Sequence, residues 1–98
     1  MLAMRIERLA WDEWNLAHIR KHGVTAQEVE EILGHPFSRE DTYKGREQLI
    51  GSIDTGRILS IVIGPVPGED GSHYVFSARP ASSRERRRYA QAMGEGST

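Results

Sequence analysis

Three stretches in the second half of the chain have the pattern of apolar and polar residues that is typical of β-strands. The stretches cover residues 46–53, 57–63 and 74–79. The middle stretch is aliphatic on both of its faces, with Ile58, Leu59, Ile61, Val62 and Ile63. A strand that is apolar on both faces is typical of the centre of a sheet, so we expect this segment to be the central strand.

The first half of the chain shows the spacing of helices instead. One helix is predicted to begin after Asp12, a favourable N-cap residue, and to end before Gly23, which suits the left-handed position that follows a helix. A second helix is predicted to begin at the capping box of Thr25 and Glu28 and to stop at Gly-His-Pro, residues 34–36. Because few residues separate the two helices, we expect a helical hairpin.

Two weaker patterns complete the prediction. Residues 4–11 alternate weakly and indicate a first strand, and the polar residues 37–43 indicate a short edge strand or a loop. The predicted order is therefore β-α-α, then three or four antiparallel strands, then a final helix. Helices kept apart from a run of hairpin-connected strands are typical of an α+β fold, here with a mainly antiparallel twisted sheet packed by helices.

The last predicted strand has two faces of different polarity. Strict alternation places one set of side chains in the core, namely Tyr74, Phe76 and Ala78. It places the other set on a more polar surface, namely His73, Val75, Ser77 and Arg79. We therefore expect His73 and Arg79 to project from the same face of the sheet.

An arginine-rich helix follows Pro80. Ser82 and Glu85 have the spacing of a capping box, which places the start of the helix just after the proline. Helical periodicity puts Arg86 on the same stripe as Tyr89 and predicts that Arg86 faces the sheet. The other arginines of this helix are predicted to face water: Arg84, Arg87 and Arg88.

Length and composition set the class of protein. A chain of 98 residues predicts one domain, which we place at 1–93, followed by a disordered tail at 94–98. Without cysteine no disulfide framework is possible, and neither a spanning helix nor a signal peptide is predicted. These features lead us to expect a cytoplasmic protein that does not bind a membrane.

The distribution of charge is more informative than its sum. The net charge of −1 argues against a nucleic-acid-binding protein. However, residues 1–56 carry seven Lys and Arg against ten Asp and Glu, whereas residues 57–98 carry six against four. The late part of the chain is therefore positive, and an anionic partner remains compatible with one surface.

The sequence lacks several common catalytic signatures. It has no phosphate-cradling glycine loop, no H-E-x-x-H sequence and no cysteine nucleophile. His18 and His22 are four residues apart on one helix face, a spacing that can chelate a metal, but the sequence offers no third ligand. We therefore predict neither a metal site nor a cofactor.

The remaining chemistry is that of cations around phosphate. Arginine presents a planar, permanently charged fork that matches a phosphate group. If the strands are neighbours, Arg57, Arg79 and Arg86 converge, and His73 supplies a group that exchanges protons near neutral pH. Such a set would allow metal-free RNA cleavage, in which the ribose 2′-hydroxyl attacks the adjacent phosphate.

Structural interpretations stand beside the catalytic ones. Arg86 would be structural if it paired with a carboxylate such as Glu47 or Asp54. Tyr89 is either a core aromatic or a site residue that donates a proton or stacks on a base. The exposed arginines of the last helix are most simply a solvated face, and His22 is most simply a cation favoured at a helix C-terminus.

Four pieces of the chain, in order, resemble the BrnT family of type II toxin–antitoxin ribonuclease toxins, which have a RelE-like fold. The first two are Trp11-Asp12-Glu13 with Asn15 and Ile19-Arg20-Lys21-His22-Gly23-Val24, and an acidic second helix that ends near Pro36. The other two are Ile50-Gly51 before Gly56-Arg57-Ile58-Leu59, and Ser77-Ala78-Arg79-Pro80-Ala81 leading to Glu85-Arg86 and Tyr89. Together these pieces span roughly residues 10–90.

The resemblance implies a toxin that inhibits translation by cleaving RNA. It also implies an antitoxin partner of the BrnA type, through which the toxin would meet DNA only indirectly. Carried over position by position, the predicted catalytic set is Arg57, Arg79, Arg86 and Tyr89, with His73 added from its place on the last strand. The predicted RNA-binding residues are Lys21, His22, Arg46 and Arg84, and Glu85 is predicted to give structural support.

This sequence departs from the family pattern before its last strand. A Gly-Pro-Val-Pro-Gly segment intervenes at residues 64–68, and His73 stands where a basic residue often does. An alternative hypothesis is therefore a catalytically weak or inactive homologue that acts as an antitoxin-binding corepressor module. A third hypothesis is a stand-alone RNA-binding domain.

Overall fold

The computed structural model describes residues 5–95. Within this range the elements follow the order β-α-α-β-β-β-β-α, with a short 3₁₀ turn at Tyr43–Gly45. The strands are β1 (Arg8–Ala10), β2 (Phe37–Asp41), β3 (Glu47–Ser52), β4 (Ile58–Pro65) and β5 (Ser72–Pro80). The helices are α1 (Glu13–Arg20), α2 (Ala26–Ile32) and α3 (Ser83–Glu95). The predicted α+β class and element order are confirmed.

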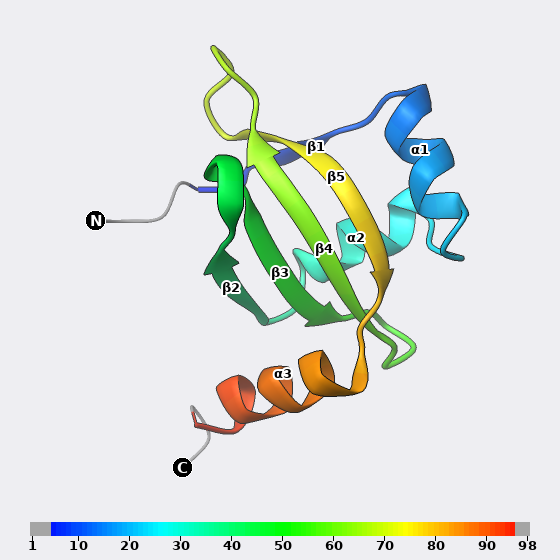
Figure 1. Cartoon of the computed structure of the whole chain (residues 1–98), viewed down its shortest axis with the longest axis vertical. Helices are drawn as coiled ribbons and strands as arrows, with labels where there is room; N and C mark the ends of the chain where they lie inside the picture. The colour runs from blue at the N-terminus through cyan, green and yellow to red at the C-terminus, as the bar shows by residue number, and fades with distance from the viewer. Residues whose placement is uncertain (1–4, 96–98) are drawn as a thin grey trace.

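The strands form one five-stranded sheet in the order β1-β5-β4-β3-β2. The pairs from β2 to β5 are antiparallel, and β1 joins β5 in parallel. The aliphatic strand β4 is central, as predicted. Figure 1 shows α2 behind the sheet and α1 beside it next to β5, while α3 lies at its lower end and contacts β2 and β3.

Both predicted helix starts have the expected caps. Asp12 and Asn15 form a reciprocal pair at the start of α1, and Thr25 and Glu28 do the same at the start of α2. The fully buried Asn15 also donates its side-chain amide to the carbonyl oxygens of Ala10 and Val75, at 2.9 and 3.1 Å. This amide therefore joins α1 to β1 and β5, because it satisfies backbone groups that water cannot reach.

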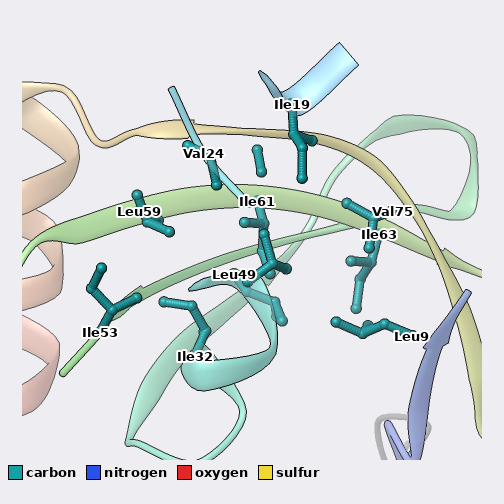
Figure 2. Packing of buried hydrophobic residues seen from close by; sticks show 12 residues of the cluster. Leu9, Ile19, Val24, Ile32, Leu49, Ile53, Leu59, Ile61, Ile63 and Val75 are labelled. Carbon is teal, nitrogen blue, oxygen red and sulfur yellow. The ribbon is translucent and has the colours of Figure 1, made fainter. Parts of the chain in front are cut away.

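The core lies between the sheet and the α1–α2 pair. Figure 2 shows aliphatic side chains from β3, β4 and β5 meeting those of the two helices. The fully buried members include Ile32, Leu49, Leu59, Ile61, Ile63 and Val75. One face of the sheet is thus covered by helices. The side chains that point the other way form what we call the second face, which includes Gln48, Ser60, Val62, Gly64, Tyr74, Ser77 and Arg79.

A β-bulge in β5 overturns the face assignment that strict alternation predicted. Ile63 pairs with Val75, but the preceding residue Val62 pairs with Ser77, so Phe76 is an extra residue. An extra residue reverses the side to which the following side chains point. Consequently His73 and Val75 lie in the core, whereas Arg79 belongs to the second face. The prediction that His73 and Arg79 share a face is wrong.

The rotation of α3 also differs from the prediction. Glu85 is buried and Tyr89 is half-buried, so this stripe faces the sheet, whereas Arg86 is exposed. The predicted inward position is therefore right for Tyr89 and wrong for Arg86, whose place is taken by Glu85. The helix also includes Gly94 and Glu95, so the expectation of a tail from residue 94 is wrong for these two positions, and residues 96–98 lie outside the described range.

Replacing Gly51 with valine is expected to destabilise the fold by about 1–3 kcal/mol, because a side chain there would overpack the core. A β-carbon at this position would lie 3.0 Å from the side chains of both Ile32 and Phe37. Urea denaturation would measure the loss. The matched control is Gly94 in α3, where a β-carbon meets nothing within 4 Å and Gly94→Ala should stabilise the helix. Unchanged stability in Gly51→Val would show that α2 can move aside.

The helices of residues 5–95 include none with the length and apolar character that crossing a membrane requires.

Candidate functional site

The strongest polar cluster joins the end of β5 to the start of α3. Arg79 donates from both terminal nitrogens to Glu85, at 2.7 Å to Oε1 and 2.8 Å to Oε2. The same carboxylate accepts from the backbone N–H of Ser82 at 2.9 Å, which completes the predicted capping box. The pair therefore fixes the arginine against the first turn of α3.

Two residues of the second face complete this cluster. Gln48 donates from its side-chain amide to Ser60 Oγ at 2.8 Å and to Glu85 Oε2 at 2.9 Å. Ser60 and Glu85 are 2% and 8% exposed, so these bonds are largely shielded from water. Sequence reasoning did not identify Gln48 or Ser60, since a polar residue on an otherwise apolar strand gives no signal until its partners are known.

The electrostatics of the cluster follow from these contacts. Hydrogen bonding to Arg79 is the main reason that the pKa of Glu85 falls from 4.5 to about 2, against the opposing effect of burial. The same bond raises the pKa of Arg79. Glu85 is thus a permanent carboxylate at neutral pH. It holds Arg79 in place and is a poor proton acceptor, in keeping with the supporting role expected for it.

A second feature of the same face is a stack of Arg46 on Phe76. The guanidinium carbon of Arg46 lies 3.7 Å from the centroid of the Phe76 ring. The Tyr74 ring meets Phe76 edge-on, with centroids 5.0 Å apart, and its hydroxyl donates to both carboxylate oxygens of Asp12 at 3.0 Å. Arg46 and Arg79 therefore lie on one side of the sheet.

Arg57 is held elsewhere. Its guanidinium donates to the Gly23 carbonyl at 3.2 Å and to Glu28 Oε1 at 2.9 Å, both at the α1–α2 connection. These contacts tie the start of β4 to the helices behind the sheet. Arg79 is fixed on the second face, so the structure does not bring Arg57 and Arg79 together as the sequence predicted.

His73 is fully buried on the helix-covered side of β5. Neither ring nitrogen has a hydrogen-bond partner within residues 5–95. A side chain in this position does not reach the second face, where Arg79 lies. The expectation that His73 and Arg79 act together is therefore not supported by the geometry, and we leave His73 out of the proposed site.

Replacing His73 with leucine is expected to raise the free energy of unfolding by about 1 kcal/mol, because two buried polar atoms without partners are removed. The RNA cleavage that the sequence predicts should stay within about twofold of the wild type, since the side chain is enclosed. Thermal melting and a cleavage assay on the same preparation measure both. A folded His73→Leu protein that no longer cleaves RNA would return His73 to the site.

The predicted residues of α3 divide between two environments. Arg86 donates to the Ala81 carbonyl at 2.9 Å and to Ser83 Oγ at 3.2 Å, so its expected carboxylate partners, Glu47 and Asp54, are not used. Tyr89 faces the sheet, and its hydroxyl donates to the Pro36 carbonyl at 3.3 Å. The Tyr89 hydroxyl therefore joins α3 to the residue that directly precedes β2.

The predicted RNA-binding residues do not form one surface either. Arg84 is exposed in the first turn of α3, near the Arg79 cluster. Lys21 and His22 are exposed just after α1, which packs against β5. The His22 ring contacts the ring of His18, which in turn stacks on Trp14. Of these four residues, Arg46 lies on the second face and Arg84 lies beside Glu85 of the Arg79 cluster, whereas Lys21 and His22 lie elsewhere.

No group of three or more His, Cys, Asp or Glu side chains is placed to hold a metal ion in the part of the chain that the structure describes. His18 and His22 are neighbours there, as their spacing predicted, but a chelating set would need further ligands.

Comparison with known proteins gives a likeness to a solved structure. A scan against protein-family models finds no match, and a search of the curated proteins finds none either. Among solved structures, the chain is similar to the ribonuclease toxin BrnT of Brucella abortus, with a TM-score of 0.61 and 26% sequence identity. The similarity covers 83% of this chain and 100% of the toxin chain. The α+β fold described above is thus the fold of the BrnT ribonuclease toxin.

Proposed function

We propose that this protein is a ribonuclease toxin of a type II toxin–antitoxin system, which cleaves RNA without a metal and so inhibits translation. The observation that supports the proposal is that hydrogen bonds fix Arg79 on the second face. Arg79 is fixed by Glu85, whose carboxylate in turn accepts from Gln48 and Ser60, on a fold shared with a ribonuclease toxin. A cation that is already ordered stabilises developing negative charge without a cost of reorganisation.

The proposed reaction is an internal transesterification. The ribose 2′-oxygen forms a bond to the adjacent phosphorus, and the bond from phosphorus to the 5′-oxygen breaks. The 2′-hydroxyl proton passes to water and the 5′-oxygen takes a proton from water, which leaves a 2′,3′-cyclic phosphate. Arg79 would stabilise the charge on the phosphate oxygens, and Arg46 and Arg84 would bind the neighbouring chain.

Exposure supports this assignment of Arg79. Its side chain is 43% exposed, so a phosphate can approach the guanidinium while Glu85 holds it from the other side. Arginine carries five donors, of which two bonds to Glu85 and one to the Pro80 carbonyl at 3.3 Å use three, all on the terminal nitrogens. Further donors therefore remain for an anionic substrate.

The proposed partner is an antitoxin of the BrnA type, which would neutralise the toxin by docking on it and would connect it to DNA. The proposed location is the cytoplasm, where both translation and the antitoxin are found. These statements rest on the likeness to the Brucella toxin.

The test is incubation of purified protein with total RNA and with translating ribosomes, each with and without EDTA, followed by mapping of the cut ends. Cleavage that persists in EDTA and leaves 2′,3′-cyclic phosphate ends is the expected result. Cleavage that EDTA abolishes would contradict the metal-free reaction. No cleavage under any condition would favour the alternative, a corepressor module that binds an antitoxin without acting on RNA.

A further inference from the structure

The Arg46–Phe76 stack lies on the second face without serving the core. Phe76 is the extra residue of the β-bulge, so its ring is directed away from the helix-covered side. Arg46 and Phe76 are both partly exposed. The backbone directs the Phe76 ring out of the core, and the Arg46 guanidinium covers it. Packing against the helices therefore does not explain the position of this ring.

At Gly64, strand β4 has no side chain that would obstruct the Phe76 ring. A β-carbon at Gly64 would lie 3.0 Å from Cε2 of Phe76 and 3.4 Å from Cγ of Arg46. Glycine at this position therefore lets both side chains lie close to β4. Tyr74 contacts the edge of the Phe76 ring, and the tyrosine is itself fixed through Asp12. The stack is thus supported from below and from one side.

The stack also lies close to the proposed reaction centre. Phe76 and Arg79 are three residues apart on β5, which corresponds to about 10 Å along a strand. Arg46 is two residues from Gln48 on β3, and Gln48 contacts Glu85. A short single-stranded RNA can therefore place a phosphate at Arg79 and an adjacent base at the stack.

From these observations we infer that Gly64, Phe76, Tyr74 and Arg46 form a platform on which an unpaired base of the RNA substrate stacks, next to the phosphate held by Arg79. The inference rests on the proposed function. Arginine planes and aromatic rings are the surfaces on which proteins stack splayed-out bases, and the guanidinium also attracts the RNA backbone. The occupant is thus a single-stranded segment, because a base inside a duplex has both faces covered by its stacked neighbours.

The experiment measures binding of a short single-stranded RNA in which every ribose is 2′-O-methylated, so that cleavage cannot occur. A set of such RNAs, each lacking the base at one position, is titrated by fluorescence anisotropy against wild type, Phe76→Leu and Arg46→Lys. The leucine keeps the apolar bulk without the ring, and the lysine keeps the charge without the plane.

For the wild type, loss of the base at one position is expected to weaken binding about tenfold, the usual contribution of a stacked base. For both variants the same loss should weaken binding less than twofold, because the platform is already absent. Trp14→Ala is the matched control: this ring is 59% exposed and stacks on His18 of α1, outside the proposed platform, so its base-loss profile should equal that of the wild type.

Two results would overturn the inference, and only the second would also contradict the proposed function. In the first, unmodified RNA is still cleaved, but loss of a base weakens binding to the wild type at no position, or weakens binding to the two variants as much as to the wild type. This result would contradict the platform and would leave the proposed function in place. Failure of the wild type to bind or cleave any RNA removes both.

Discussion

Arg79→Ala is expected to lower the rate of RNA cleavage by about 100- to 1,000-fold, the usual effect of removing one donor that stabilises transition-state charge. Arg79 is the best-positioned cation of the second face, since both terminal nitrogens are fixed by Glu85. The loss should appear in kcat as well as in kcat/KM, because the developing charge is greatest in the transition state.

The substitution also leaves Glu85 without its cation, which complicates interpretation. Glu85 is 8% exposed, and an unpaired carboxylate there destabilises the fold. The double variant Arg79→Ala with Glu85→Gln removes that charge. It should recover stability without recovering activity, which separates a loss of fold from a loss of chemistry.

The matched control is Arg39→Ala. Arg39 also donates to one glutamate through two nitrogens, here Glu47 on β3, but it lies on the helix-covered side of the sheet. This variant should cleave RNA at close to the wild-type rate. Normal cleavage by a folded Arg79→Ala protein would remove Arg79 from the site, whatever the control does.

Glu85→Gln is expected to destabilise the protein by about 2–3 kcal/mol at pH 7, and this difference from the wild type should vanish towards pH 2. The pKa of Glu85 is lowered in the folded state from 4.5 to about 2, mainly by Arg79. A lowered acid pKa means that the folded protein binds its proton less readily than the unfolded chain does. The stabilisation is therefore fully present above about pH 5 and is lost as the pH falls towards 2.

Urea denaturation from pH 2 to pH 7 measures this difference. The control is Glu69→Gln, which removes an exposed carboxylate in the β4–β5 loop and should change stability by no more than about 0.5 kcal/mol at any pH. A Glu85→Gln protein that differs from the wild type equally at pH 2 and pH 7 would mean that the ion pair contributes nothing to folding.

Local sequence signals predicted most of the fold. Asp12, Thr25 and Ser82 each precede a helix with a partner three residues later, and such caps depend only on neighbouring residues. The aliphatic run of β4 was sufficient to place it at the centre of the sheet. These features could be predicted because each is determined within a few residues of chain.

The errors have a different physical origin. The bulge at Phe76 arises from pairing with β4, a distant segment, so alternation within β5 alone assigned His73 to the wrong face. The arginine-rich helix has few apolar residues to define its orientation, and the prediction turned Arg86 inward. The structure buries Glu85 instead, because ion pairing with Arg79 satisfies a charge that sequence patterns place in water.

The parallel pairing of β1 with β5 has a consequence for synthesis. Leu9 is opposite His73, so the first strand finds its partner only after more than 60 further residues have been made. Contacts this distant in sequence form late and slow the folding of a small domain. A growing chain also lacks Arg79 and Glu85 until almost the whole domain has left the ribosome. We therefore expect that a nascent chain has no assembled cleavage site until the residues of β5 and α3 have left the ribosome.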